Sequence, residues 1–281
     1  MEAAKLVYDV GMHAGEDTEF YLSRGCRVVG IEANPALVER LQDKFKAEIR
    51  EGRLHIIGRA IASAHGKMRF AVFQGEIDLW SSGIDAIIDQ NTAVSGAEPE
   101  LLAVDAVPFA DVIQEHGMPY YVKVGIEGLG SVCVEALHGF EARPRYISID
   151  SAVTSGVASF EAAFNEIAQL WSLGYRRFKY IDQAALHRLH GMQLSKEGPL
   201  TRYEYRQHSS GPFGDESPDE WRSIRETLQR MRELLAYQNL IGLGGRYYHH
   251  PASKVARRLR KLVKRLPSHS WYDLHARLGS S

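Results

Sequence analysis

The stretch YDVGMHAGEDT, residues 8–18, decides the fold. An apolar run over 5–10 leads into a turn that contains Gly11 and Gly15, and a helical pattern follows over 16–25. A strand, a glycine turn and a helix in this order open an α/β sheet, in which ligands bind beyond the carboxyl ends of the strands. The stretch therefore predicts a ligand site at the first strand-to-helix turn.

The composition is that of a globular protein with a sizeable core. The 281 residues are 44% hydrophobic and 25% charged, with a net charge of −1, so any basic surface must be local. Cys26 and Cys133 show no metal-ligand spacing, which indicates thiols in a reducing compartment. Neither a secretory signal nor an apolar run near the ~18 residues of a membrane span is visible. We expect a cytoplasmic protein.

Strand and helix patterns alternate along the chain. The apolar runs typical of strands lie at 5–10, 26–33, 54–62, 67–74, 101–107, 119–128, 143–151 and 176–182. The helical patterns between them lie at 16–25, 36–49, 109–117, 131–140 and 160–174. This alternation predicts a mostly parallel central sheet with helices on both faces.

The pattern changes after about residue 205. A stretch rich in Gly, Ser and Pro is followed by a helical pattern over 223–242 and by a basic amphipathic pattern over 253–267. We expect a Rossmann-like domain over 1–206 and a C-terminal extension over 207–281, made of a loop and helices with little strand character.

The charges of the first turn discriminate between two ligand classes. Asp9 precedes the first glycine, and Glu16 and Asp17 lie in the first helical turn. A dinucleotide requires G-x-G-x-x-G, whereas the spacing here is G-x-x-x-G, and these carboxylates would repel a pyrophosphate. S-adenosylmethionine has no phosphate and carries an ammonium and a sulfonium, which negative charge stabilises. The turn therefore favours S-adenosylmethionine over a nicotinamide dinucleotide.

Two further turns complete the predicted cofactor site. Glu32 ends the second strand 17 residues after Gly15, where an acid accepts the ribose hydroxyls of an adenosine. The end of the third apolar run lies where the adenine would pack. The predicted cofactor contacts are Asp9, Gly11, His13, Gly15 and Thr18, then Glu32, Ala33 and Asn34, then Arg59, Ala60 and Ile61. The alternative is local: a tight turn that needs glycine, and an ordinary strand end.

Several blocks of the sequence resemble the FkbM-type S-adenosylmethionine-dependent methyltransferases. They are YDVGMHAGEDTEFYLSRGCRVVGIEANP (8–35), DLWSSG (78–83), YVKVGIEG (121–128), RPRYISIDS (143–151), SSGPFGDESPDEW (209–221) and SWYDLHARLG (270–279). The resemblance implies a Rossmann-like class I methyltransferase fold, with S-adenosylmethionine as methyl donor and S-adenosylhomocysteine as product. It also implies O-methylation of a sugar, a polysaccharide or glycolipid precursor, or a natural product.

One position departs from the family pattern. The family has aspartate where KVGIEG has Gly125, at the end of a central strand. If that aspartate aligns or deprotonates the acceptor, its loss costs about 3–5 kcal/mol. Strand alternation places Lys123, Gly125 and Glu127 on one side, and they are the catalytic candidates. The alternatives are a Lys–Glu pair that supports the strand end and, for the whole chain, a catalytically impaired relative that binds cofactor or glycan.

The resemblance also suggests where the acceptor binds. Glu76, Asp78 and Trp80 resemble an active-site loop, in which the indole would stack on a sugar; the alternative is a loop anchored by one tryptophan. Asp150 and Ser151 match the next strand end and are expected on the substrate side. No Cys/His cluster indicates a metal, and we expect none.

The basic stretch 253–267 carries seven Lys or Arg and no acid, with apolar residues at a spacing of 3–4. Such a helix can lie on an anionic membrane surface; the alternative is an apolar stripe packed on the domain with solvated charges. The neutral remainder of the chain argues against a nucleic-acid partner. We expect a small-molecule or glycan hydroxyl as acceptor and no nucleic acid; for this helix the sequence favours packing on the domain, and peripheral contact with an anionic membrane is the other hypothesis. Nothing in the sequence indicates the oligomeric state.

Overall fold

A computed structural model describes residues 4–73, 81–126, 128–154, 159–183, 186, 189, 193–205, 209–242, 245–251 and 271–279. The chain forms two compact units. The first comprises Met1–Ile147 and Gln193–Thr201, and the second comprises Ser148–Met192 and Arg202–Ser281.

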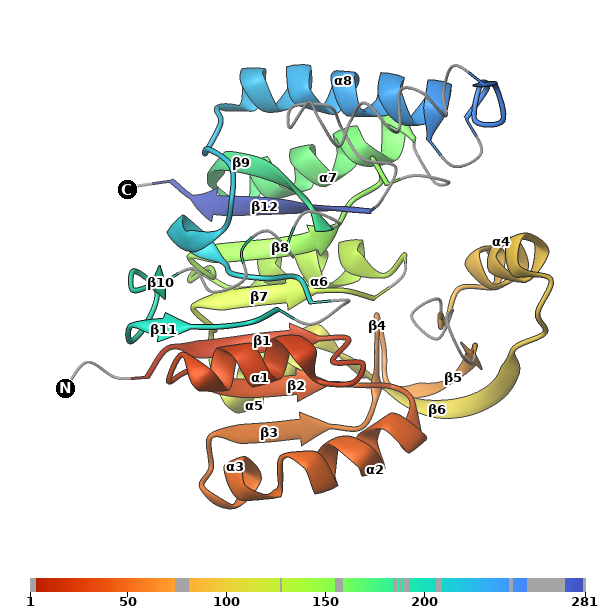
Figure 1. Ribbon diagram of the computed structural model, residues 1–281. Coiled ribbons are helices and arrows are strands. Elements are labelled where there is room, and N and C mark those ends of the chain that lie inside the picture. The colour runs from red at the N-terminus through yellow and green to blue at the C-terminus, as the bar shows by residue number, and fades with distance from the viewer. Residues whose placement is uncertain are drawn as a thin grey trace. The chain divides into compact units, whose positions relative to one another are not determined.

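Parallel strands form the centre of the first unit. They are β3 (Leu54–Ile57), β2 (Arg27–Ile31), β1 (Leu6–Val10) and β7 (Tyr121–Val124), in this spatial order. β2 and β3 follow β1 in one direction, whereas β7 lies on the other side of β1 (Figure 1). The sheet order therefore reverses between β1 and β7, and such a switch point is where open α/β sheets bind ligands.

Helices cover this sheet on two sides. They are α1 (Glu16–Ser23), α2 (Pro35–Lys44), α3 (Lys46–Arg50), α5 (Phe109–His116) and α6 (Gly130–Ala136), with a 3₁₀ turn over Leu137–Gly139. Figure 1 shows α1 in front of the strands and α5 behind them. The single helix expected over 36–49 is interrupted at Phe45, where α2 ends and α3 begins. Asn34 caps α2 by accepting the Ala36 N–H at 3.0 Å, and Pro35 occupies the first helical position.

The first unit also contains a second, smaller sheet. Its order is β4 (Ala60–Ala62), β6 (Glu100–Pro108) and β5 (Gly66–Val72), and it carries α4 (Asp85–Ser95), a helix that the sequence did not predict. The single strand expected over 54–62 is wrong. Arg59 N–H donates to Ile57 O at 3.0 Å, which turns the chain so that β3 and β4 join different sheets.

The short strands β10 (Gln193–Leu194) and β11 (Thr201–Arg202) pair with each other. Two buried charges fix the segment between them to the first unit. The Arg24 guanidinium donates to the carbonyls of Leu194 and Pro199, and the Glu197 carboxylate pairs with Lys5 at 2.8 Å. This segment therefore belongs to the first unit, although it lies far along the chain.

The second unit contains the C-terminal strand. Its elements are β8 (Tyr146–Asp150) from Ser148 onward, α7 (Phe160–Ser172), β9 (Tyr175–Asp182), a 3₁₀ turn (Gly214–Glu216), α8 (Ile224–Ile241) and β12 (Tyr272–Leu278). β12 runs antiparallel to β9, and its Leu274 and Ala276 are fully buried. The expectation of little strand character is therefore wrong for 272–278. The helical pattern over 223–242 is confirmed by α8, whereas 253–267 lies outside the described residues.

The larger sheet has seven strands in the order β3-β2-β1-β7-β8-β12-β9. The expected Rossmann-like fold, with a mostly parallel central sheet, is confirmed. The expected domain boundary at residue 206 stays a prediction. Within the ranges given above, no helix combines the length and the apolar character that a bilayer crossing requires.

Candidate functional site

The turn after β1 lies over the end of β2. The N–H groups of Gly11 and Met12 both donate to Ile31 O, at 2.9 and 3.1 Å, and the Gly15 N–H closes the turn onto Met12 O at 2.8 Å. α1 then begins at Gly15 without a side-chain cap. The backbone at the switch point is thus fixed by hydrogen bonds before any ligand binds.

Both glycines of this turn are required by contacts within the chain. Gly11 has φ +83°, and a Cβ there would overlap the carbonyl oxygen of Gly125. Gly15 has φ +78°, and a Cβ there would lie 2.6 Å from Cε2 of Phe45. Since a side chain is excluded by neighbouring protein atoms, these glycines let α2 and the end of β7 approach the turn.

Asp9 lies at the centre of a buried polar cluster. Its side chain is fully buried, Oδ2 accepts the Thr18 hydroxyl at 2.7 Å, and Oδ1 lies 3.3 Å from Nζ of Lys123. The same ammonium donates to Gly11 O at 2.7 Å and lies 3.8 Å from Oδ2 of Asp17. One lysine of β7 therefore balances two buried carboxylates and holds the turn carbonyl.

This cluster shows protein partners for three predicted site residues, Asp9, Thr18 and Lys123. Asp9 and Thr18 contact each other, and Lys123 donates to the backbone of the turn. The Lys123 ammonium, 3.3 Å away, offsets part of the negative charge of Asp9. A direct contact of Asp9 with cofactor, and a catalytic role of Lys123, stay predictions.

Glu32 joins the two turns at the mouth of the site. Its Oε2 accepts the His13 N–H at 2.9 Å, and its Oε1 accepts the Asn34 N–H at 2.8 Å. The residue is 7% exposed, and this burial raises its pKa, while the two backbone donors act in the opposite direction. Each carboxylate oxygen keeps a further lone pair, so Glu32 can still accept hydroxyl groups.

His13 is brought to the site by a constrained backbone. Its φ of +51° is unusual for a residue with a side chain, and it aims the N–H at Glu32. The imidazole Nδ1 lies 3.3 Å from Oε1 of Glu16. Burial acts to raise the pKa of Glu16, but the hydrogen bond with His13 and the charges of His13 and Lys44 outweigh it and leave that pKa below its usual value.

The turn as a whole carries more negative than positive charge. Its acids are Asp9, Glu16, Asp17, Glu19 and Glu32, and its ammonium groups are those of Lys44 and Lys123. Lys44, which the sequence did not single out, donates to Ala14 O at 2.8 Å and pairs with Glu19 at 3.2 Å. Such a turn attracts a cationic ligand and repels a pyrophosphate.

The residues expected beside the adenine lie at the base of the small sheet. Ala60 and Ile61 are buried in β4, Arg59 is exposed, and Ala33 packs on the core cluster that contains Ala60. Ala33 follows Glu32 directly, so the small sheet packs against the turn after β2. Contacts of these residues with adenine stay predictions.

The end of β7 continues from this turn. The Gly125 N–H donates to Val10 O at 2.8 Å, and Gly125 itself is partly exposed. The structure thus brings Gly11, Lys123 and Gly125 together. Four other predicted site residues, Glu76, Asp78, Trp80 and Glu127, lie outside the described residues.

Asp150 and Ser151 belong to the second unit, at the end of β8. Asp150 is exposed, whereas the Ser151 hydroxyl is buried and donates to Oε2 of Glu166 at 2.7 Å. Oε1 of Glu166 accepts the Ala152 N–H at 2.8 Å. Burial raises the pKa of Glu166 to about 7, the charge of Asp150 adds to this, and the two donors oppose it.

Two of these residues, Lys44 and Glu166, were missed by sequence reasoning. Lys44 contacts Ala14, 30 positions away, and Glu166 lies 15 positions from Ser151, so no local spacing could have revealed either contact. In the described part of the chain, no three His, Cys, Asp or Glu side chains gather as a metal site would require.

Comparison with known proteins yields distant relatives. No protein-family model matches the chain. A curated protein of Methanospirillum hungatei JF-1, named "Probable ribosomal RNA small subunit methyltransferase A", is 36% identical over 55 residues. The matching region is 20% of this chain and 22% of that protein.

Among solved structures, the methyltransferase FkbM from Methylobacillus flagellatus KT is 16% identical with a TM-score of 0.41, covering 63% of this chain and 40% of that one. The StiE O-MT structure, residues 961–1257, is 11% identical with a TM-score of 0.40, covering 99% and 69%. The chain thus spans about a fifth of the curated relative and two fifths of the FkbM structure.

Proposed function

We propose that this protein binds S-adenosylmethionine in the turn after β1 and transfers its methyl group to an acceptor hydroxyl. The observation that carries the proposal is the Glu32 carboxylate. Backbone donors from both adjoining turns hold it at the switch point, with lone pairs left for two ribose hydroxyls. The resemblance to the FkbM-type methyltransferases adds the O-methylation and the acceptor class: a sugar, a polysaccharide or glycolipid precursor, or a natural product.

The net negative charge of the turn complements the positive charges of this cofactor. Asp9 and Asp17 are buried against the single ammonium of Lys123, and Glu16 and Glu32 add negative charge at the rim. This excess stabilises the ammonium of the methionine end. Bound there, S-adenosylmethionine supplies an electrophilic methyl group. The same excess disfavours the dinucleotide alternative.

The chain's own contribution to the reaction is positioning. The partly exposed end of β7 at Gly125 lies beside Gly11, so an acceptor placed there would lie next to the methionine end. Alignment of acceptor and methyl supplies most of such a rate enhancement. With glycine at 125, no carboxylate at that position removes the hydroxyl proton, and Glu127 is the proposed base.

Calorimetry with S-adenosylhomocysteine and, in parallel, NAD tests the cofactor assignment. We expect binding of the first alone. Glu32→Gln should weaken it about 10- to 100-fold, because an ionised acceptor is lost and an amide N–H₂ then faces a backbone donor. Glu39→Gln, an exposed acid of α2, is the matched control and should bind like the original. Equal affinity in both variants would remove Glu32 from the site.

Turnover tests the chemistry. Formation of S-adenosylhomocysteine is measured with glycan acceptors and with ribosomal RNA fragments, and we expect turnover with the glycans alone. Gly125→Asp should raise turnover if the family carboxylate acts as base or clamp. An unchanged rate would show that position 125 does not take part in the reaction.

A further inference from the structure

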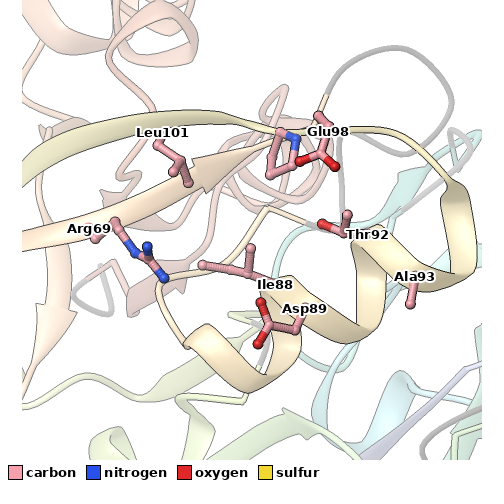
Figure 2. Close-up of a pocket in the computed structure, with 8 residues that line it drawn as sticks. Arg69, Ile88, Asp89, Thr92, Ala93, Glu98 and Leu101 are labelled. Atoms are coloured by element: carbon pink, nitrogen blue, oxygen red, sulfur yellow. The ribbon is translucent and has the colours of Figure 1, made fainter.

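A hollow of about 420 Å³ lies between α4 and the small sheet. It is lined by Arg69, Ile88, Asp89, Thr92, Ala93, Glu98, Pro99 and Leu101. Figure 2 shows Arg69 reaching from β5 toward Ile88 and Asp89 of α4, with Glu98 and Leu101 facing the helix. The hollow belongs to the first unit and is separate from the cofactor turn.

Packed contacts fix both walls of this hollow. Ile88 is 5% exposed and packs with Ala71 and Phe73, which anchors α4 on β5. Ala71 and Ser82 exchange backbone hydrogen bonds of 2.8 and 3.1 Å just before the helix begins. The Arg69 guanidinium also forms an ion pair with Asp85 in the first turn of α4. These contacts fix the position of α4 relative to β5, the two elements on either side of the hollow.

The polar groups around the hollow are available to a ligand. Within the described ranges, the side chains of Asp89, Thr92 and Glu98 make no hydrogen bond or ion pair with the protein. Arg69 has five N–H donors and uses few of them on Asp85. The site thus combines donors and acceptors, and Ile88, Pro99 and Leu101 add apolar surface.

This chemistry suits a neutral ligand rich in hydroxyl groups. Each hydroxyl can donate to a carboxylate and accept from a guanidinium, and the C–H faces of a sugar ring can rest on the apolar side chains. Two carboxylates against one guanidinium, itself paired with Asp85, leave the hollow negative. A phosphorylated ligand, and a nucleic acid in particular, would be repelled.

The position of α4 connects the hollow to the predicted reaction point. Ile84 and Ile87 pack on Gly128, where a Cβ would lie 2.8 Å from Cδ1 of Ile84 and overlap Ile87. Gly128 comes three residues after Gly125. Asp89 and Thr92 follow Ile87 by about 3 and 8 Å along the helix axis, at about 1.5 Å per residue. The hollow therefore begins within about one or two helical turns of the contact that α4 makes with Gly128.

We propose that this hollow is a subsite for a neutral, hydroxyl-rich part of the acceptor, carried by the helix whose Ile84 and Ile87 contact Gly128 in the segment after β7. The inference rests on the proposed function, since it assigns the site to the acceptor of that reaction. It adds recognition residues, Arg69, Asp89, Thr92 and Glu98, that no motif of the sequence indicated.

Saturation-transfer NMR on the full chain, saturated with S-adenosylhomocysteine, tests the subsite. The probes are maltose, cellobiose and, as an anionic comparison, glucose 6-phosphate. We expect transfer to at least one disaccharide and none to the phosphate. Asp89→Asn should weaken the disaccharide about tenfold, and Thr92→Trp should abolish its binding by filling the hollow. Asp43→Asn, an exposed acid of α2 outside the hollow, is the control and should not alter binding.

Calorimetry of S-adenosylhomocysteine on the same samples separates the two proposals and shows that each variant is folded. If the cofactor product binds but neither disaccharide does, the subsite is wrong and the proposed function stands. The subsite is also wrong if disaccharide binding survives both variants, or if glucose 6-phosphate binds in preference. If the cofactor product fails to bind the unaltered protein, the proposed function itself fails.

Discussion

Glu32 and Lys123 have different roles in the same turn. Glu32 faces the mouth with lone pairs to spare, whereas Lys123 is buried against Asp9 and Asp17 and holds the Gly11 carbonyl. In the structure Lys123 fixes the turn, whereas Glu32 both joins the two turns and keeps acceptor capacity for a ligand. This distinction explains why the turn keeps its form around so much negative charge.

Gly11→Ala should destabilise the turn and abolish binding of S-adenosylhomocysteine. The new Cβ would overlap the Gly125 carbonyl, in addition to the strain of φ +83°. Gly52→Ala is the matched control, because Gly52 has φ +69° but nothing within 4 Å of the added Cβ. Urea unfolding of both variants separates the clash from the backbone strain. An equal loss of stability would show that the overlap is relieved without cost.

At the scale of single elements, β12 is a strand that was not predicted from the sequence. Its sequence YDLHARL carries Asp273 and His275, which are both buried in the structure. The buried imidazole of His275 has its pKa lowered to about 3, chiefly by burial and also by the charge of Lys179. Tyr272, Leu274, Ala276 and Leu278 nevertheless alternate with polar residues, so the period-2 pattern of a strand is present in the sequence and should have predicted β12.

Leu274→Ala in β12 should lower the free energy of unfolding by about 2–5 kcal/mol, as is usual for a fully buried leucine. Leu278→Ala, at the partly buried end of the same strand, should cost clearly less. Urea denaturation followed by circular dichroism compares the two. Equal losses would contradict the burial of β12 in the sheet.

The junction of β8 with α7 should make stability depend on pH. Between the ordinary value of 4.5 and its raised pKa of about 7, Glu166 keeps a proton in the folded protein that the unfolded chain releases. The free energy of unfolding therefore falls as the pH rises through this window, by an amount on the order of 2 kcal/mol.

Glu166→Gln should remove this fall, since an amide does not titrate and can still bond Ser151. Urea unfolding at pH 5 and pH 8 measures it. Glu161→Gln, an exposed acid of the same helix, should keep the dependence of the original protein. A fall that persists in Glu166→Gln would assign it to another group.

At the scale of the whole molecule, the net charge of −1 hides a local imbalance. The acids gather at the first turn and around the hollow by α4, both in the first unit. A protein that is nearly neutral overall can therefore still select against anionic ligands at each site.

Binding of the cofactor product should stabilise the folded protein. At a concentration of S-adenosylhomocysteine about 100-fold above its Kd, we expect the free energy of unfolding to rise by about 2.7 kcal/mol. Thermal unfolding with and without ligand measures this. The Glu32→Gln variant at the same ligand concentration should show a much smaller rise. A shift that is equal in both would place the ligand elsewhere.

The sequence by itself predicted the alternation of strands and helices, the glycine turn after the first strand and the acid Glu32 at the end of the second strand. These features depend on local spacing, which a linear pattern records. Only the tertiary structure decided that Lys123 contacts Asp9 and Gly11, that 54–62 divides between two sheets, and that 272–278 pairs with β9. Each of these depends on contacts between segments far apart in the chain, and burial selects such contacts without leaving a periodic trace in the sequence.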